Sequence, residues 1–315
     1  MIGNRLLLHA VFLFLAPIVV AWFGLSVPAA ILLVLLLLLW RWVVVLSGLA
    51  APANTPPVIL STIAISHFVE KVRWCMDRLG VDYVERPAGG TLGAFFTGRT
   101  VPQLKVRTGA VQSVIGNSAE ILRYLWGNYS VEDTERAAFL RPTKDRVALE
   151  RRIDQHGVSL QVWVYHHVLD DRDLTLRAWG ADDPATPVWQ RQSLRLLFPV
   201  LRALIRRSFR INETNYQKAV ARIEELLQEA DTWLADDRDS LLNDGELNYT
   251  DLAFAAISGV WVVPPEYGGG RASAVRLEPQ LLPPAMLEDT ERWRSRFPRV
   301  VGFVERLYRE ERSAL

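Results

Sequence analysis

The chain has 315 residues, which is room for about two domains of ordinary size. Its formal net charge is +1, so no overall electrostatic bias points to nucleic acid as a partner. The one cysteine, Cys75, excludes an intramolecular disulfide and weakly favours a reducing compartment.

Apolar residues concentrate at the N-terminus. Leu6–Gly24 carries no charge, and a second apolar segment, Leu25 to about Leu46, is interrupted only by Arg41. A membrane-spanning helix needs ~20 apolar residues, so two spans fit, whereas a cleaved signal peptide has an apolar core of only ~7–15. We therefore expect residues 1–50 to form a transmembrane helical hairpin that anchors the chain in membrane lipid. A single long, kinked span is the alternative.

The charges around these segments predict an orientation. Arg5 and Arg41 lie at the two outer ends, and the turn at Gly24–Pro28 has no Lys or Arg. Positive residues favour the cytoplasmic side of a membrane, so both ends and the domain that follows are expected in the cytoplasm. Residues 51–57 are proline-rich and predict an extended linker.

After residue 57 the pattern alternates between strands and helices. Short apolar runs rich in β-branched residues predict strands, and apolar residues at helical spacing predict a helix between the first two. In chain order we expect a strand at Val58–Ala64, a helix from about Phe68 to Leu79, a strand at Val81–Arg86, a hairpin of Gln103–Arg107 and Val111–Ile115, and a helix opened by a capping box of Asn117 and Glu120. This order is the thioredoxin-like topology. The rest of the chain is predicted to be helical.

The helix at residues 68–79 is expected to be amphipathic. Phe68, Val72 and Cys75 or Met76 fall on the apolar side, so Cys75 is expected to be a core thiol. Four charged residues are expected on the opposite, solvated side: Glu70, Arg73, Asp77 and Arg78.

Four segments carry a resemblance to a known family. They are ISHFVEKVRWCMDRLGVDYVE, TVPQLKV, VIGNSAEILRYL and ELNYTDLAFAAI, in that order. Together they resemble the glutathione S-transferase superfamily. The resemblance implies an α+β fold, with a thioredoxin-like glutathione-binding domain at residues 58–129 and an all-α C-terminal domain at residues 130–315. The stretch from Asp170 to Asn212 has no counterpart in compact members of that family.

Ser66 is the candidate catalytic residue. It is expected at the start of a helix, where backbone N–H groups and the helix dipole favour an anion. A thiol with a pKa near 8.5 supplies little thiolate at neutral pH, and a serine hydroxyl can stabilise that anion by donating a hydrogen bond. The alternative is that Ser66 serves only as the helix N-cap.

The resemblance also implies a binding site for glutathione. Pro102 resembles a cis-proline that leaves the backbone of Val101 free to pair with the peptide, although the sequence by itself predicts the trans isomer. Ser118, at a helix start, resembles the site for the γ-glutamyl carboxylate. Arg99 is a candidate for the glycyl carboxylate, and the alternative is that it is a solvated loop cation. Asn117 stands where the family usually has an acid that pairs with the ammonium group.

Arginine, aromatic and histidine residues outside these segments are explained by the fold. Arg191, Arg195, Arg202, Arg206 and Arg210 are expected to be solvated on a helix whose apolar side packs into its own domain. Four aromatic residues are candidates for the pocket of a second substrate, although core and surface positions explain them better: Trp163, Tyr165, His166 and Trp179. No His spacing suggests a metal site.

Two classes of function follow. The first is a transferase that uses glutathione as co-substrate, without a metal, and adds its thiolate to an apolar small molecule. The second is a non-catalytic binding or assembly module on the same fold, because a fold does not fix a function. Asn117 and the stretch from Asp170 to Asn212 favour the second class, whereas Ser66, Val101–Pro102 and Ser118 together favour the first. The sequence does not decide between a monomer and a homodimer.

Overall fold

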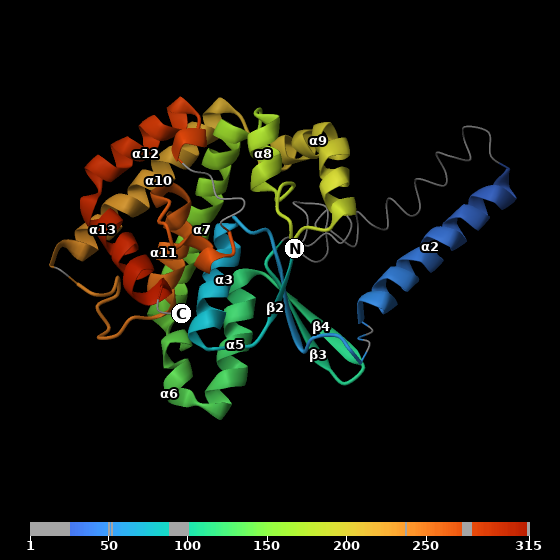
Figure 1. Ribbon diagram of the computed structural model, residues 1–315, viewed down its shortest axis with the longest axis horizontal. Helices are drawn as coiled ribbons and strands as arrows, with labels where there is room; N and C mark the ends of the chain where they lie inside the picture. Colours follow the sequence, from blue (N-terminus) through green and yellow to red (C-terminus); the bar gives the residue numbers. More distant parts are fainter. Residues whose placement is uncertain are drawn as a thin grey trace. The chain divides into compact units, whose positions relative to one another are not determined.

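The structure is a computed structural model that describes residues 26–49, 51, 53–87, 101–236, 238–272 and 279–313 (Figure 1). The chain forms two compact units. One comprises residues 1–57 and 106–113, and the other comprises residues 58–105 and 114–315. The candidate site residues that the structure describes belong to the second unit. The boundaries predicted from the sequence at residues 57 and 129 stay predictions.

The first unit contains helix α2, Val27–Leu49. Among the described residues, no helix is both long and apolar enough to cross a membrane. Arg41 interrupts the apolar run of α2, and residues 27–40 would reach only ~21 Å into a hydrocarbon core of ~30 Å. The prediction of a membrane protein with its domain facing the cytoplasm is therefore wrong, and the expected hairpin anchor and lipid partner are not supported. The first predicted span, Leu6–Gly24, lies outside the described residues.

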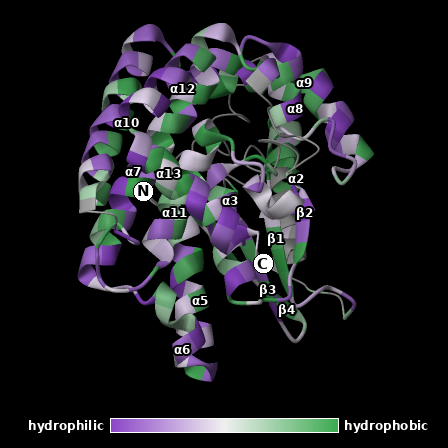
Figure 2. Cartoon of the chain, turned by 60° about the vertical axis from the view of Figure 1, so that its left-hand side comes forward, coloured by the Kyte–Doolittle hydropathy of each residue, from purple (hydrophilic) through white to green (hydrophobic). Residues whose placement is uncertain are grey.

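A four-stranded sheet forms the base of the N-terminal region. Its order is β2-β1-β3-β4, with β1 parallel to β2 in a register that pairs Ile59 with Val84. Figure 2 draws β1, the strand between β2 and β3, in the hydrophobic colour. The bounds are β1 Val58–Thr62, β2 Val84–Pro87, β3 Gln103–Thr108 and β4 Val111–Gly116. The predicted succession of these strands along the chain is therefore confirmed.

Two predicted strands differ at their ends for local reasons. The first strand ends at Thr62 because the next residue, Ile63, accepts a hydrogen bond from the Ser66 N–H at 2.9 Å and closes a turn. The second begins at Val84 because the Val81 N–H caps the preceding helix, α3 (His67–Arg78), by bonding to the Met76 carbonyl at 3.0 Å. Gly80, at φ +61°, supplies the left-handed residue that this helix end requires.

The strand directions bring three chain segments to one end of the sheet. The Arg107 N–H on β3 donates to the Pro57 carbonyl before β1 at 2.8 Å, so β3 runs antiparallel to β1. A two-residue turn reverses the chain again into β4. The end of β1, the start of β3 and the end of β4 therefore share one end of the sheet.

The described part of the chain after the sheet is helical, as predicted. The long helix α7 and helix α11 pack together, and α11 also packs on α3. Asn248 and Asp251 form the expected capping box at the start of α11. The α-helices are α5 Ser118–Glu132, α6 Thr134–Ala137, α7 Lys144–Val168, α8 Arg172–Ala178, α9 Val188–Ser208, α10 Glu213–Trp233, α11 Tyr249–Val262, α12 Pro284–Arg296 and α13 Pro298–Leu307.

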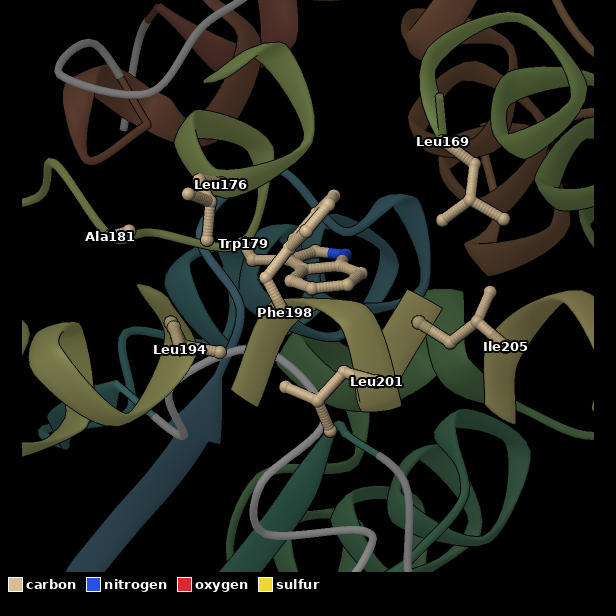
Figure 3. Packing of buried hydrophobic residues seen from close by; sticks show 8 residues of the cluster. All are labelled: Leu169, Leu176, Trp179, Ala181, Leu194, Phe198, Leu201 and Ile205. Atoms are coloured by element: carbon tan, nitrogen blue, oxygen red, sulfur yellow. The ribbon is translucent and has the colours of Figure 1, made fainter. Parts of the chain in front are cut away.

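Helices α8 and α9 occupy the stretch that had no counterpart in the resemblance. They share a small hydrophobic cluster in which the rings of Trp179 and Phe198 are 5.7 Å apart (Figure 3). α9 carries hydrophobic and hydrophilic residues along its whole length (Figure 2). Its buried side contributes Leu194, Phe198, Leu201 and Ile205, whereas Arg195, Arg202 and Arg206 are partly exposed and pair with Asp182 or Asp170.

Candidate functional site

Ser66 lies at the N-cap position of α3, but its side chain is not used as a cap. Its backbone has φ −68° and ψ 122°, and its hydroxyl makes no cap hydrogen bond. Its carbonyl accepts the Glu70 N–H at 2.9 Å, which begins the helix. The residue is half-buried. The hydroxyl therefore stands at a helix N-terminus without the capping role that was the main alternative to catalysis.

The Val101–Pro102 segment lies directly before β3. The bond between the two residues is cis, which matches the form that the resemblance implies rather than the trans form expected from the sequence. Pro102 is buried, and Val101 is half-buried. Arg99, the candidate for the glycyl carboxylate, lies outside the described residues.

Asn117 and Ser118 begin helix α5. The Asn117 side chain accepts the Ala119 N–H at 3.0 Å, so Asn117 caps the helix as predicted, but through the second helical residue and not through Glu120 as in a capping box. Its backbone, however, has φ +74° and ψ 131°, whereas an N-cap residue usually has an ordinary extended conformation with negative φ. The positive φ of Asn117 costs on the order of 1–3 kcal/mol, and residues with such rare backbone conformations are concentrated at functional sites. Asn117 is exposed and Ser118 is buried.

These segments converge although they are far apart in sequence. The Ser66 turn follows β1, Val101–Pro102 precedes β3, and Asn117–Ser118 follows β4. All three therefore lie at the end of the sheet where β1 and β4 end and β3 begins. Two of them lead into the N-terminus of a helix, α3 or α5. The arrangement can receive an extended peptide along β3 and anions at the helix starts.

Tyr267, which the sequence did not single out, holds the Ser66 turn. Its hydroxyl donates to the Ile65 carbonyl at 3.0 Å, and its side chain is 4 % exposed. Gly259 on α11 makes room for the ring, because a Cβ there would lie 2.7 Å from Tyr267. The C-terminal helical region thus fixes the residue before Ser66.

A buried ion network lies beneath this end of the sheet. Arg73 bonds to Glu70 and to Glu85 at 2.7 Å each, and Arg312 bonds to the other oxygen of Glu70 at 2.9 Å. Thr62 donates to Glu85 at 3.4 Å, which ties β1 to the network. Burial alone would raise the pKa of Glu85, but the hydrogen bond and charge of Arg73 bring this pKa below its usual value.

The predicted solvated face of α3 is therefore wrong. Glu70 and Arg73 are fully buried, and Asp77 accepts a hydrogen bond from Arg312 at 2.7 Å. The amphipathic pattern misled because α3 is covered on both sides, by α11 and by the C-terminal segment that carries Arg312. Cys75 is fully buried, so it is the expected core thiol, and this burial raises the pKa of the thiol to about 12.

Two buried histidines lie near the start of α3. The His67 Nε2 donates to the Gly157 carbonyl at 3.0 Å, and both ring nitrogens of His156 lack a hydrogen-bond partner among the described residues. Burial lowers the pKa of His67 to about 4, although its hydrogen bond acts in the other direction. Burial, together with the nearby His67, lowers the pKa of His156 to about 3.

We expect these histidines to make the protein acid-sensitive. Their folded-state pKa values lie below the unfolded value of 6.5, so their contribution to stability is present above pH 6.5 and is lost as the pH falls. When the pH falls from 7 to 5, each of the two histidines should lower the free energy of unfolding by on the order of 2 kcal/mol. Urea unfolding of the wild type and of His156→Leu at both pH values measures this. The variant should lose about 2 kcal/mol less than the wild type over this range, and an equal loss in both proteins would contradict the assignment.

A cavity of about 190 Å³ opens beside the Ser66 turn. One wall consists of the residues after β1 and at the end of β2, including Ile63, Ala64 and Glu85. The other wall is the connection between α8 and α9, with Trp179 and Thr186, and Arg271 completes the lining. Of the four aromatic candidates, Trp179 lines this cavity, whereas Trp163 is buried and donates to Asp289 at 2.8 Å.

Within the described ranges, no group of three or more His, Cys, Asp or Glu residues is arranged to hold a metal ion. The adjacent His166 and His167 instead contact Tyr216 through their rings.

Similarity to known proteins is confined to solved structures. No protein family description matches the sequence, and no curated protein matches it. The chain is similar to a glutathione S-transferase from Methylobacterium radiotolerans solved with glutathione sulfonate, at 17% identity, over 82% of this chain and 93% of that one, with a TM-score of 0.48. It is also similar to a theta class glutathione S-transferase from Xanthomonas axonopodis pv. citri with glutathione bound, at 18% identity, over 79% and 97%, with a TM-score of 0.38.

A third similar structure is FzlA from C. crescentus, at 14% identity, over 75% of this chain and 100% of that one, with a TM-score of 0.39. Strand order and the helical region described above, rather than these similarities, define the α+β fold of this chain.

Proposed function

We propose that this protein is a glutathione transferase in which Ser66 stabilises the glutathione thiolate for attack on an apolar electrophile. The observation that carries the proposal is the Ser66 hydroxyl, which stands at the N-terminus of α3 and makes no cap hydrogen bond. Glutathione is the co-substrate, and no metal takes part. The structures solved with glutathione or its sulfonate motivate the choice of thiol, and the experiments below test it.

The reaction needs one negative charge to be stabilised. The thiol proton leaves to solvent, and the sulfur lone pair then forms the S–C bond. The leaving group departs with its bonding electrons, or an addition product takes a proton from water. A hydroxyl donor and a helix N-terminus both lower the free energy of the thiolate, which raises its fraction at neutral pH. Ser66 acts as a hydrogen-bond donor and not as a base.

The peptide part of glutathione would bind along the end of the sheet. Val101 offers its backbone beside β3, and Ser118 with the start of α5 offers donors to the γ-glutamyl carboxylate. Asn117, at the start of α5, would be the residue nearest to the ammonium group beside that carboxylate. Arg99 is retained as the candidate for the glycyl carboxylate.

Asn117→Asp should tighten glutathione binding. A carboxylate pairs with the ammonium group where an amide cannot, and a hydrogen bond to a charged group contributes about 1.5–3 kcal/mol. The dissociation constant should therefore fall by roughly tenfold or more, as measured by calorimetry with glutathione on the full chain. Asp is as good an N-cap as Asn, so the unfolding midpoint should stay unchanged.

A glutathione analogue without the amino group serves as the control ligand, because its affinity should not rise in Asn117→Asp. If neither protein binds glutathione, the alternative function gains support. In that case the same fold serves as a non-catalytic binding or assembly module, and Asn117 in place of an acid is the feature that favours it.

A further inference from the structure

Helix α9 has a second apolar side, and this one is exposed. Outside α2, more than half of the large hydrophobic side chains that are exposed in the described part of the chain lie on α9. They are Val188, Trp189, Leu196, Leu197, Val200 and Leu204. Apolar side chains scattered singly over a surface need no explanation, but a contiguous group of them marks an interaction site.

Four of these side chains form a row. Leu196, Val200 and Leu204 follow one another at four-residue intervals, so they lie one above the other along one side of the helix. Trp189 lies two helical turns before Leu196 on the same side. The exposed fractions are 62 % for Trp189, 80 % for Leu196, 54 % for Val200 and 37 % for Leu204. We call this row the α9 ridge.

The opposite packing of the helix keeps the α9 ridge at the surface. Leu194, Phe198, Leu201 and Ile205 occupy a different side of α9 and are buried in the cluster that contains Trp179 (Figure 3). Turning the helix to bury the ridge would expose this buried row, at about 1.5–3 kcal/mol for each large apolar side chain. The domain therefore cannot cover the ridge by rotating α9.

The charges on α9 are all positive. Residues 188–210 contain six arginines and no Asp, Glu or Lys. Arg202 and Arg206 share one oxygen of a single carboxylate, Asp170. Arg207 continues the row of the ridge three residues after Leu204, is exposed, and has no ion-pair partner among the described residues. The ridge thus lies beside cations that can still bind further carboxylates.

The surroundings of α9 decide between the possible partners. The segment before α9 carries five carboxylates, at Asp170, Asp171, Asp173, Asp182 and Asp183. Two of them contact arginines of α9, and the Asp173 side chain is 92 % exposed. A broad anionic surface such as a lipid bilayer would meet these carboxylates as well as the arginines, whereas a partner as narrow as a helix can lie along α9 alone. A second copy of the ridge would bring the arginines of both chains together, and like charges repel.

We propose that the α9 ridge is a docking surface for an acidic amphipathic helix of a partner protein. The apolar side of the partner helix would pack along the ridge, as the side-chain rows of two helices interlock in proteins. Asp and Glu residues at the border of this apolar side would pair with Arg207 and with Arg202 and Arg206. The surface uses none of the residues of the glutathione site, so the proposal does not depend on the proposed function. It gives the stretch at residues 170–212 a role of its own.

The test uses the full chain and a synthetic helical peptide of about 18 residues, which is long enough to follow the ridge at ~1.5 Å per residue. The peptide has leucines at helical spacing on one side and glutamates along both borders of that side. A second peptide carries lysines in place of the glutamates. Fluorescence anisotropy should show binding of the glutamate peptide, and binding of the lysine peptide that is weaker by roughly tenfold or more. The glutamate peptide should bind less tightly as NaCl rises from about 50 mM to about 500 mM, because salt screens exposed charges.

Two pairs of variants locate the binding on the ridge. Leu196→Glu places a carboxylate in the ridge and should weaken binding of the glutamate peptide by roughly tenfold or more. Val131→Glu is the matched control, because Val131 is 84 % exposed but lies on α5. Arg207→Glu should weaken binding by a similar factor, whereas Arg309→Glu, at an exposed arginine near the C-terminus, should leave it unchanged. All four positions are exposed, so the unfolding midpoints should stay close to that of the wild type.

Several results would overturn the proposal. One is equal binding of the glutamate and lysine peptides, or equal binding of the glutamate peptide by Leu196→Glu and Val131→Glu. Another is a chain that does not bind the peptide but sediments with vesicles of phosphatidylcholine and phosphatidylserine, and loses this in Leu196→Glu, which would make a lipid surface the partner. A last one is a chain that ignores the peptide but dimerises in analytical ultracentrifugation, and becomes monomeric in Leu196→Glu, which would make a second copy the partner.

Discussion

Ser66→Ala should reduce the rate of glutathione conjugation by ~10²–10³, the usual effect of removing one preorganised donor to a developing anion. Glutathione binding should change little, because Val101, Ser118 and Arg99 would supply most contacts to the peptide. The unfolding midpoint should also change little, because the Ser66 side chain makes no cap hydrogen bond that could be lost. The measurement is the rate per folded molecule, beside a denaturation curve for the same preparation.

Two variants sharpen this experiment. Ser113→Ala removes an exposed hydroxyl from β4 and should leave the rate unchanged. Ser66→Cys should gain thiol–disulfide exchange, because a cysteine at a helix N-terminus has a lowered pKa. A Ser66→Ala protein that is folded and conjugates at the wild-type rate would remove Ser66 from the mechanism and favour the binding module.

Arg312→Ala should destabilise the protein by about 3 kcal/mol, because it leaves two carboxylates with fewer partners in the interior. Glu70 is fully buried and would keep only Arg73, and Asp77 would lose a hydrogen bond of 2.7 Å. The pKa of Arg312 is raised because the charges of Glu70 and Asp77 outweigh the opposing effect of burial. Urea unfolding at pH 7 measures the loss.

Arg309→Ala is the matched control three residues away. Arg309 is largely exposed and pairs only with its neighbour Glu310 among the described residues, so its loss should stay within about 0.5 kcal/mol. Arg312→Lys keeps the charge with fewer donors and should fall between the two, which keeps the test informative if Arg312→Ala does not fold. Equal stabilities of the Arg312 and Arg309 variants would show that the network is not a source of stability.

The sequence was sufficient for the order of elements in the thioredoxin-like region. Strands β1, β3 and β4 and helix α3 appeared within a few residues of their predicted positions, because apolar periodicity and turn residues act locally. The capping box of α11 was predicted for the same reason, since Asn248 and Asp251 are three residues apart. Ser66, Val101–Pro102 and Ser118 were found as candidates because their motifs are short and contiguous.

The sequence misled where the outcome depended on packing. Glu70 and Arg73 looked solvated because a helix pattern cannot show that the C-terminal Arg312 would cover that face. The N-terminal apolar segments predicted a membrane protein, but among the described residues no helix is long and apolar enough to cross one.

What the sequence by itself determined was the local structure and the short motifs from which the candidate site is proposed, because N-caps, turns and strand patterns depend on neighbouring residues. The tertiary structure decided which distant groups meet. It placed the Tyr267 hydroxyl on the Ile65 carbonyl, 202 positions away in sequence, and set the α8–α9 connection against the Ser66 turn. Contacts of this kind depend on how whole helices pack and leave no local pattern in the chain.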